Sequence, residues 1–161
     1  MTENYIRAEF HCHTVYSPDS MVELQDLLKA CDEKGIDKIA ITDHGCMKGA
    51  LKARQMEPAR VIVAEEVETP EGEILGYFMT EEIPQGLPAT EVVRRLQGQG
   101  AFISLAHPFD PHRSWWKTKT IEQILPYLDG VEVFNARCRR QEYNQSAYEF
   151  ALEHGKALMA G

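Results

Sequence analysis

Five short apolar runs in this chain each end in a polar residue that can bind a metal ion or a substrate. These terminal residues are His13, His44, Glu66, His107 and Asn135. Stretches with helical spacing separate the runs, and strands that alternate with helices are typical of a parallel α/β sheet or barrel. In such folds the loops at the carboxyl ends of the strands meet at one mouth. The sequence therefore predicts an α/β fold that gathers these five side chains.

The expected elements follow from apolar runs, glycines and turn residues. Strands are expected at residues 7–13, 38–42, 60–64 (running straight into 65–68), 73–79, 101–106, 130–134 and 156–160, with helices at 21–34, 49–56, 89–97, 121–128 and 141–154. Ser20 and Glu23 fit a capping box at the start of the first helix, and Gly35 fits its end. The turn at residues 69–72 makes the next strand a hairpin partner. No linker or repeat divides the chain, so we expect one domain over residues 1–161.

The first run leads into His11-Cys12-His13, and Asp19 follows six residues after His13. Alternate side chains of a strand point to the same side, so the two imidazoles would lie one pleat apart, a spacing that suits two ligands of one metal ion. Asp19, placed after a turn, offers an oxygen ligand to a second ion. Taken alone, His-x-His fits an edge strand with two solvated histidines equally well. The later strand ends favour the metal site.

Composition limits the class of partner. The chain has 161 residues, 43% of them hydrophobic, which is enough to form a hydrophobic core without disulfide bonds or structural metal ions. Its formal net charge of −8 argues against duplex nucleic acid or an anionic membrane as a partner. A phosphate substrate is compatible with that charge, because bound cations reverse the local field. Four scattered cysteines, a polar start at residues 1–7 and no membrane-length apolar run predict a cytoplasmic protein with reduced thiols.

The strand ends resemble, in order, the motifs of the polymerase and histidinol phosphatase (PHP) family of metal-dependent phosphoesterases. The matching segments are His-Cys-His-Thr-x-Tyr-Ser-Pro-Asp-Ser at 11–20, Ile-Thr-Asp-His-Gly at 41–45, Ala-Glu-Glu-Val-Glu-Thr at 64–69, Leu-Ala-His-Pro at 105–108 and Val-Glu-Val-Phe-Asn at 131–135. The resemblance implies a distorted (β/α)7 barrel that carries up to three divalent metal ions (Mn, Zn or Fe) and hydrolyses phosphate esters.

The resemblance also implies which residues bind metal. His11 and His13 would bind the first ion, Glu66 would bridge the first and second, His107 would bind the second, and Asp19 and His44 would bind the third. We prefer Glu66 to Glu65, because neighbours on a strand face opposite ways and Glu66 is in register with the family's glutamate. Asp43 is expected to orient an imidazole or to pack locally.

Two positions depart from the family's pattern. Glu73 stands where relatives often have histidine. Its carboxylate would favour Mn over Zn if it binds metal, and the alternative is an ordinary exposed hairpin residue. The family's final motif, Gly-Ser-Asp-Ala-His, would begin at residues 157–161, where the sequence stops. We therefore expect a C-terminally incomplete domain from a longer parent chain.

The implied function is hydrolysis of a small phosphomonoester, or of a nucleotide or oligonucleotide phosphodiester end, by metal-bound hydroxide. Asn135 and Arg137 are possible substrate contacts, since arginine can hold a phosphate with two hydrogen bonds. The alternative for Arg137, Arg139 and Arg140 is a solvated helix start, and for Asn135 a hydrogen bond within a loop. Two other functions stay open: a non-catalytic metal-binding or structural PHP domain, and histidinol-phosphate phosphatase. The oligomeric state is not predictable from these features.

Overall fold

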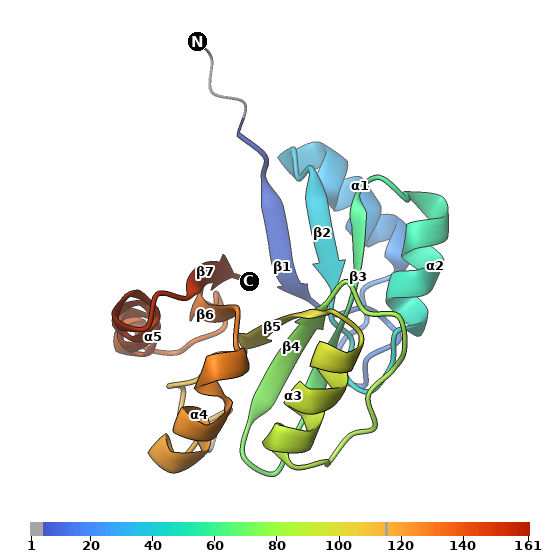
Figure 1. Ribbon diagram of the computed structural model, residues 1–161. Helices are drawn as coiled ribbons and strands as arrows, with labels where there is room; N and C mark the ends of the chain where they lie inside the picture. The colour runs from blue at the N-terminus through green and yellow to red at the C-terminus, as the bar shows by residue number, and fades with distance from the viewer. Residues whose placement is uncertain (1–4, 115) are drawn as a thin grey trace.

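The strands of the sheet pair in the order in which they occur in the chain (Figure 1). This computed structural model describes residues 5–114 and 116–161. The strands are β1 (Ala8–Cys12), β2 (Lys38–Ile41), β3 (Val61–Glu68), β4 (Glu73–Tyr77), β5 (Phe102–Leu105), β6 (Gly130–Phe134) and β7 (Ala157–Ala160). The pairing is parallel except at β4, which is antiparallel to both β3 and β5. Because β7 returns to contact β1, the sheet curls into a nearly closed barrel of the predicted class.

Helices follow the strands and pack on the outside of this barrel. They are α1 (Leu24–Lys34), α2 (Lys48–Met56), α3 (Ala89–Gly98), α4 (Thr118–Ile124), the 3-10 turn η1 (Leu125–Tyr127) and α5 (Gln141–Glu153). The helix predicted at 121–128 begins earlier, at Thr118, and tightens into η1 at Leu125. Pro126 explains this ending, because proline lacks the N–H of a regular helical turn and its ring clashes with the preceding turn.

The predicted capping box at Ser20 is wrong, although the predicted end of the helix is confirmed. The first helix begins at Leu24 after Glu23, without a side-chain cap. Ser20 Oγ instead donates a hydrogen bond to the carbonyl of His13 at 2.9 Å and so closes the turn after the histidine pair. Gly35 ends the helix in the left-handed conformation, at φ 65°.

Alternation along β3 separates two apolar layers. Val61, Val63 and Val67 pack against the helices in the main core. Ile62 and Ala64 face the barrel interior, in a smaller cluster with Tyr77. Because side chains alternate along the strand, the next residue that faces the interior is Glu66, which lies directly beyond the apolar side chains of Ile62 and Ala64. In the described part of the chain, none of the helices combines the length and the apolar character needed to cross a membrane.

Candidate metal centre

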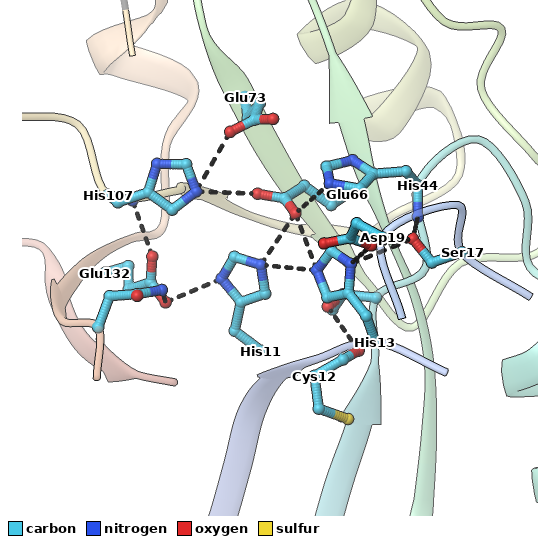
Figure 2. Close-up of polar contacts among 12 residues, drawn as sticks. His11, Cys12, His13, Ser17, Asp19, His44, Glu66, Glu73, His107 and Glu132 are labelled. Atoms are coloured by element: carbon cyan, nitrogen blue, oxygen red, sulfur yellow. Dashed lines mark hydrogen bonds and ion pairs between the residues drawn. The ribbon is translucent and has the colours of Figure 1, made fainter. Parts of the chain in front are cut away.

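Glu66 lies at the centre of a group of four histidines (Figure 2). Its Oε2 atom is 2.9 Å from His11 Nε2, 3.0 Å from His13 Nε2 and 3.3 Å from His44 Nε2. The other oxygen, Oε1, is 3.1 Å from His107 Nε2. The Glu66 side chain is fully buried. Side chains from three strand ends, β1, β2 and β5, thus converge on one carboxylate from β3.

The two histidines of the first motif point the same way, as the alternation of β1 predicts. The rings of His11 and His13 stack with centroids 5.2 Å apart, and their Nε2 atoms are 3.1 Å apart. Cys12, between them, turns away from the two rings (Figure 2). Its Sγ donates a hydrogen bond to the carbonyl of Ala40. The imidazoles therefore face the interior together.

Asp19 returns to the site through the turn after β1. Its Oδ1 atom is 2.9 Å from His13 Nδ1 and accepts a hydrogen bond from Ser17 Oγ at 2.7 Å. Burial alone would raise the pKa of the Asp19 carboxyl, but the Ser17 hydrogen bond and the nearby His13 lower it below its usual value. Ser17 Oγ also accepts the backbone N–H of His44. The turn thereby joins the ends of β1 and β2.

Asp43 packs locally rather than orienting an imidazole. Its carboxylate accepts hydrogen bonds from the backbone N–H of Thr14 at 2.6 Å and from Thr14 Oγ1 at 2.7 Å. These two bonds tie the segment after β1 to the segment after β2. Of the two roles predicted for Asp43, the structure therefore shows the local one.

Glu73 points into the site and not into solvent. Its Oε2 atom is 3.2 Å from His107 Nε2, and its side chain is 17% exposed. On the hairpin it stands opposite Glu68, whose Oε1 is 3.7 Å from His44 Nδ1. Burial, together with the charge of Glu66, raises the pKa of the Glu73 carboxyl to about 8. The alternative of an ordinary exposed hairpin residue is therefore wrong, and metal binding by Glu73 stays a prediction.

Glu132 is a site residue that the sequence analysis missed. Its Oε1 atom is 2.8 Å from His11 Nδ1, and its Oε2 accepts the backbone N–H of His107 at 2.8 Å. The Glu132 side chain is 1% exposed. A lone acid between Val131 and Val133 in an apolar strand was the available signal, because such a residue needs a buried partner.

Asn135 and Arg137 border a cavity beside the histidines. The cavity has a volume of about 430 Å³, and its lining includes His11, His13 and Asp19. Asn135 Nδ2 donates to Glu132 Oε1 at 2.9 Å, and its Oδ1 accepts from the backbone N–H of Arg137 at 3.0 Å. Asn135 therefore organises its own loop as well as lining the cavity.

Of the three arginines after β6, one faces the cavity. Arg137 Nη1 lies 3.3 Å from Asp19 Oδ2 at the cavity wall. Arg140 pairs with Glu142 at 2.6 Å at the start of α5, and Arg139 is exposed. The solvated-helix alternative thus fits Arg139 and Arg140. Arg137 is also 66% exposed, but it lies at the cavity wall, and its role as a substrate contact stays a prediction.

Charge in this site is arranged around two buried carboxylates. Burial alone would raise the pKa of the Glu66 carboxyl, but the charge of His11 and hydrogen bonds with His107, His11 and His13 lower it well below its usual value. Burial alone would lower the pKa of His11, but Glu66 and Glu132 raise it well above its usual value. Glu66 and Glu132 therefore stabilise positive charge at the position of His11.

The donor atoms fit divalent metal ions. Among the residues that the structure describes, three groups bring their ligand atoms within 4.8 Å of one another: His11, Glu66 and His107; His13, Asp19 and His44; and His44, Glu68 and Glu73. Imidazole nitrogens with carboxylate oxygens suit Zn, Mn and Fe. His44 Nδ1 is buried and has no hydrogen-bond partner among the described residues. Residues predicted to share the metal site thus lie together, and the metal that each one binds stays a prediction.

Comparison with known proteins gives both a family and a fold. Residues 9–108 match the family model described as the PHP domain. Two relatives are uncharacterized proteins of Methanocaldococcus jannaschii. MJ1587 is 35% identical over 144 residues, with 81% of this chain and 82% of that protein covered. MJ0417 is 38% identical over 160 residues, with 97% of this chain covered but only 64% of that longer protein.

Two solved structures share the fold at low sequence identity. A candidate metal-dependent phosphoesterase from Bifidobacterium adolescentis superimposes with a TM-score of 0.78 at 17% identity, covering 98% of this chain and 87% of that one. An amidohydrolase from Chromobacterium violaceum, with bound sulfate and no metal, gives a TM-score of 0.73 at 14% identity, covering 96% of this chain and 86% of that one.

Proposed function

Because the chain belongs to the PHP domain family, we propose that it is a metal-dependent hydrolase that cleaves phosphate esters with a cluster of divalent ions. One observation carries this proposal: four histidines from three strand ends converge on the buried carboxylate of Glu66 beside a cavity. A purely structural core would have little reason to bury so many ionisable groups, since each loses its hydration there. Metal ions compensate for that loss.

The proposed ligands divide around Glu66. His11 and His13 would hold one ion, His107 and Glu73 a second, and Asp19 with His44 a third. The two oxygens of Glu66 face different histidines, so this carboxylate would be able to contact two ions at once. Bound divalent ions supply Lewis acidity and make a nucleophilic water available near neutral pH.

Residues beside the cluster would bind and orient the substrate. Arg137 lies at the cavity wall next to Asp19, where its guanidinium can hold non-bridging phosphate oxygens. Asn135 holds the backbone of this arginine through its Oδ1 atom and so fixes the loop. Binding the phosphate between this loop and the histidines would place the ester bond at the cluster.

The cavity favours a small substrate or the end of a larger one. Its volume of about 430 Å³ lies in the lower part of the range for small-molecule sites. Away from the histidines it is lined by apolar side chains of α1 and β2, including Leu27 and Ile39. The proposed substrates are therefore a small phosphomonoester or a nucleotide or oligonucleotide phosphodiester end, with the leaving group directed toward α1.

Metal content and hydrolysis together test the proposal. Elemental analysis of protein purified without chelator should find about two to three ions of Mn, Fe or Zn per chain. His107→Ala should lower that content by roughly one ion. His154→Ala is the matched control, because His154 packs against Phe150 at the end of α5.

The same preparations are then assayed with p-nitrophenyl phosphate, bis-p-nitrophenyl phosphate and nucleotides. Release of product that depends on added metal and is lost in His107→Ala supports the proposed activity. Bound metal without hydrolysis of any ester would point to a structural domain instead. Less than one ion per chain would contradict the metal centre itself.

A further inference from the structure

The structure assigns Glu132 as a positioning residue of the metal centre: one carboxylate orients the imidazole of His11 and holds the backbone of His107. This inference rests on the proposed metal centre, but not on the identity of the ester. Glu132 lies on β6, outside every group of candidate ligands. Its role is therefore to act through the two histidines and not on the substrate.

The carboxylate of Glu132 is fully engaged. Oε1 is 2.8 Å from His11 Nδ1 and accepts a hydrogen bond from Asn135 Nδ2 at 2.9 Å. Oε2 accepts the backbone N–H of His107 at 2.8 Å. With 1% of its side chain exposed, Glu132 makes these contacts in a dry environment, where their direction is well defined.

The contact between Glu132 and His11 determines which ring nitrogen of His11 faces Glu66 and the other candidate metal ligands. An ionised carboxylate only accepts hydrogen bonds, so His11 Nδ1 carries the proton that lies between them. The other nitrogen, Nε2, points at Glu66 Oε2 from 2.9 Å (Figure 2). Glu132 thereby presents Nε2 as the metal-binding atom, in the way that carboxylates orient metal-ligating histidines generally.

The contact to His107 supports an unusual backbone. His107 has φ of 27°, a left-handed value that residues other than glycine rarely adopt. Its N–H is held by Glu132 and its carbonyl accepts a hydrogen bond from Ser114 Oγ at 3.0 Å. This conformation aims His107 Nε2 at Glu66 Oε1 from 3.1 Å. The rings of His11 and His107 stack at 5.7 Å as a result.

The backbone of Gly161 packs closely against the Glu132 carboxylate and His11. A side-chain carbon at Gly161 would lie 2.7 Å from Glu132 Oε1 and 2.3 Å from the Cβ of His11. The glycine thus lets the end of β7 pass directly beside the pair. Glu132 is accordingly bounded by Asn135, His11 and the backbone of position 161.

The test is Glu132→Gln, with Glu65→Gln as the matched control. Glutamine replaces one of the two carboxylate oxygens by an NH2 group, so either His11 Nδ1 or the N–H of His107 would face an amide donor in place of an acceptor. Glu65 is also fully buried, but it bonds to Ile83 and Gln85 on the opposite face of β3. Zinc affinity is measured by competition with a chromophoric chelator.

We expect Glu132→Gln to weaken zinc binding by about 10- to 100-fold and Glu65→Gln to leave it unchanged. Equal affinity in Glu132→Gln and wild type would overturn the positioning role, as would an equal loss in both variants. A second measurement needs no variant. In the zinc-loaded wild type, the ¹H–¹⁵N spectrum of the histidine rings should show His11 bound through Nε2 with a protonated Nδ1.

Coordination of His11 through Nδ1 would overturn the inference even if Glu132→Gln does not fold. Failure of the wild type to bind zinc would overturn both this inference and the proposed function. Zinc binding without hydrolysis of any phosphate ester would overturn the proposed function alone, because the affinity ratio and the ring spectrum still decide the role of Glu132.

Discussion

Glu65 and Glu66 are consecutive residues of β3 whose carboxylates lie on opposite faces of the sheet. Glu66 is within 3.3 Å of four imidazoles inside the barrel. Glu65 faces outward, where it accepts hydrogen bonds from the backbone N–H of Ile83 at 3.0 Å and from Gln85 Nε2 at 2.9 Å. The two-residue period of a strand thus gives two identical, equally buried side chains different chemical surroundings.

This pair yields a direct prediction about metal binding. Glu66→Gln removes a carboxylate that faces every proposed ligand histidine, so we expect a loss of zinc or manganese affinity of more than about tenfold. Glu65→Gln changes the same chemistry one residue away and should leave that affinity intact. Isothermal titration of both proteins after chelator treatment checks this. Comparable affinities would place the metal elsewhere in the chain.

Glu65 also predicts how stability depends on pH. Burial, opposed by the hydrogen bonds from Ile83 and Gln85, raises the pKa of the Glu65 carboxyl from 4.5 to about 7. The folded protein therefore holds this proton more tightly than the unfolded chain. The resulting stabilisation is fully present below pH 4.5 and is lost as pH rises through about 7. A shift of this size corresponds to roughly 3 kcal/mol.

Glu65→Gln should remove this titration. We expect the wild-type Tm to fall more steeply than that of Glu65→Gln between about pH 5 and pH 8. Thermal unfolding in EDTA measures the difference without a contribution from metal binding. Parallel Tm curves for the two proteins would show that Glu65 titrates with the same pKa in the folded and unfolded states.

Much of the site could be predicted from local pattern. Apolar runs that end in His13, His44 and His107 predict side chains at the carboxyl ends of strands, and the barrel brings those ends together. The choice of Glu66 over Glu65 followed from strand alternation and register with the family's glutamate. The alternation of side chains along a strand is a local property, so it can be predicted from the sequence without knowledge of tertiary contacts.

Other features depend on contacts that local pattern does not contain. Glu132 acts only because β6 lies beside β5 and because β7 returns to β1, which brings its carboxylate to His107 and His11. Ser20 fits a helix cap by sequence, but the helix begins only at Leu24, and the Ser20 hydroxyl donates to the carbonyl of His13 instead. Both outcomes depend on a three-dimensional partner, which the spacing of residues along the chain does not identify.

Glu73 predicts the metal preference of the site. A carboxylate beside His107 favours a harder ion than an imidazole does, so Glu73→His should shift the ratio of zinc to manganese affinity toward zinc by on the order of tenfold. Competition titrations with each metal give the ratio. Glu122→His, on an exposed position of α4, is the control and should leave it unchanged. An unaltered ratio in Glu73→His would mean that residue 73 does not bind the ion.

Gly49 predicts a stability effect that reaches the site. A methyl group there would lie 2.2 Å from Asp43 Oδ2 and 2.8 Å from Thr14 Oγ1. Gly49→Ala must therefore push apart the Asp43 and Thr14 side chains, whose hydrogen bond joins the ends of β1 and β2. We expect a loss of about 1–3 kcal/mol in the free energy of unfolding, measured by urea denaturation. Gly98→Ala is the control, because its methyl group meets open space in α3. It should be neutral or stabilising by up to about 1 kcal/mol. An equal effect of both substitutions would contradict the steric argument.

Arg137 predicts a separation of substrate binding from metal binding. Its guanidinium is 66% exposed at the cavity wall and touches Asp19 at 3.3 Å, so it is free to turn toward a phosphate. If it holds the substrate, Arg137→Ala should raise the KM for a phosphomonoester about tenfold or more, since a charged hydrogen bond is lost. Metal content should stay at the wild-type level, because arginine has no lone pair to offer a cation.

Arg139→Ala, which changes an exposed neighbour on the same loop, should change neither the KM nor the metal content. A fall in metal content in Arg137→Ala would instead make its contact with Asp19 the important one, and an unchanged KM would remove Arg137 from the substrate site.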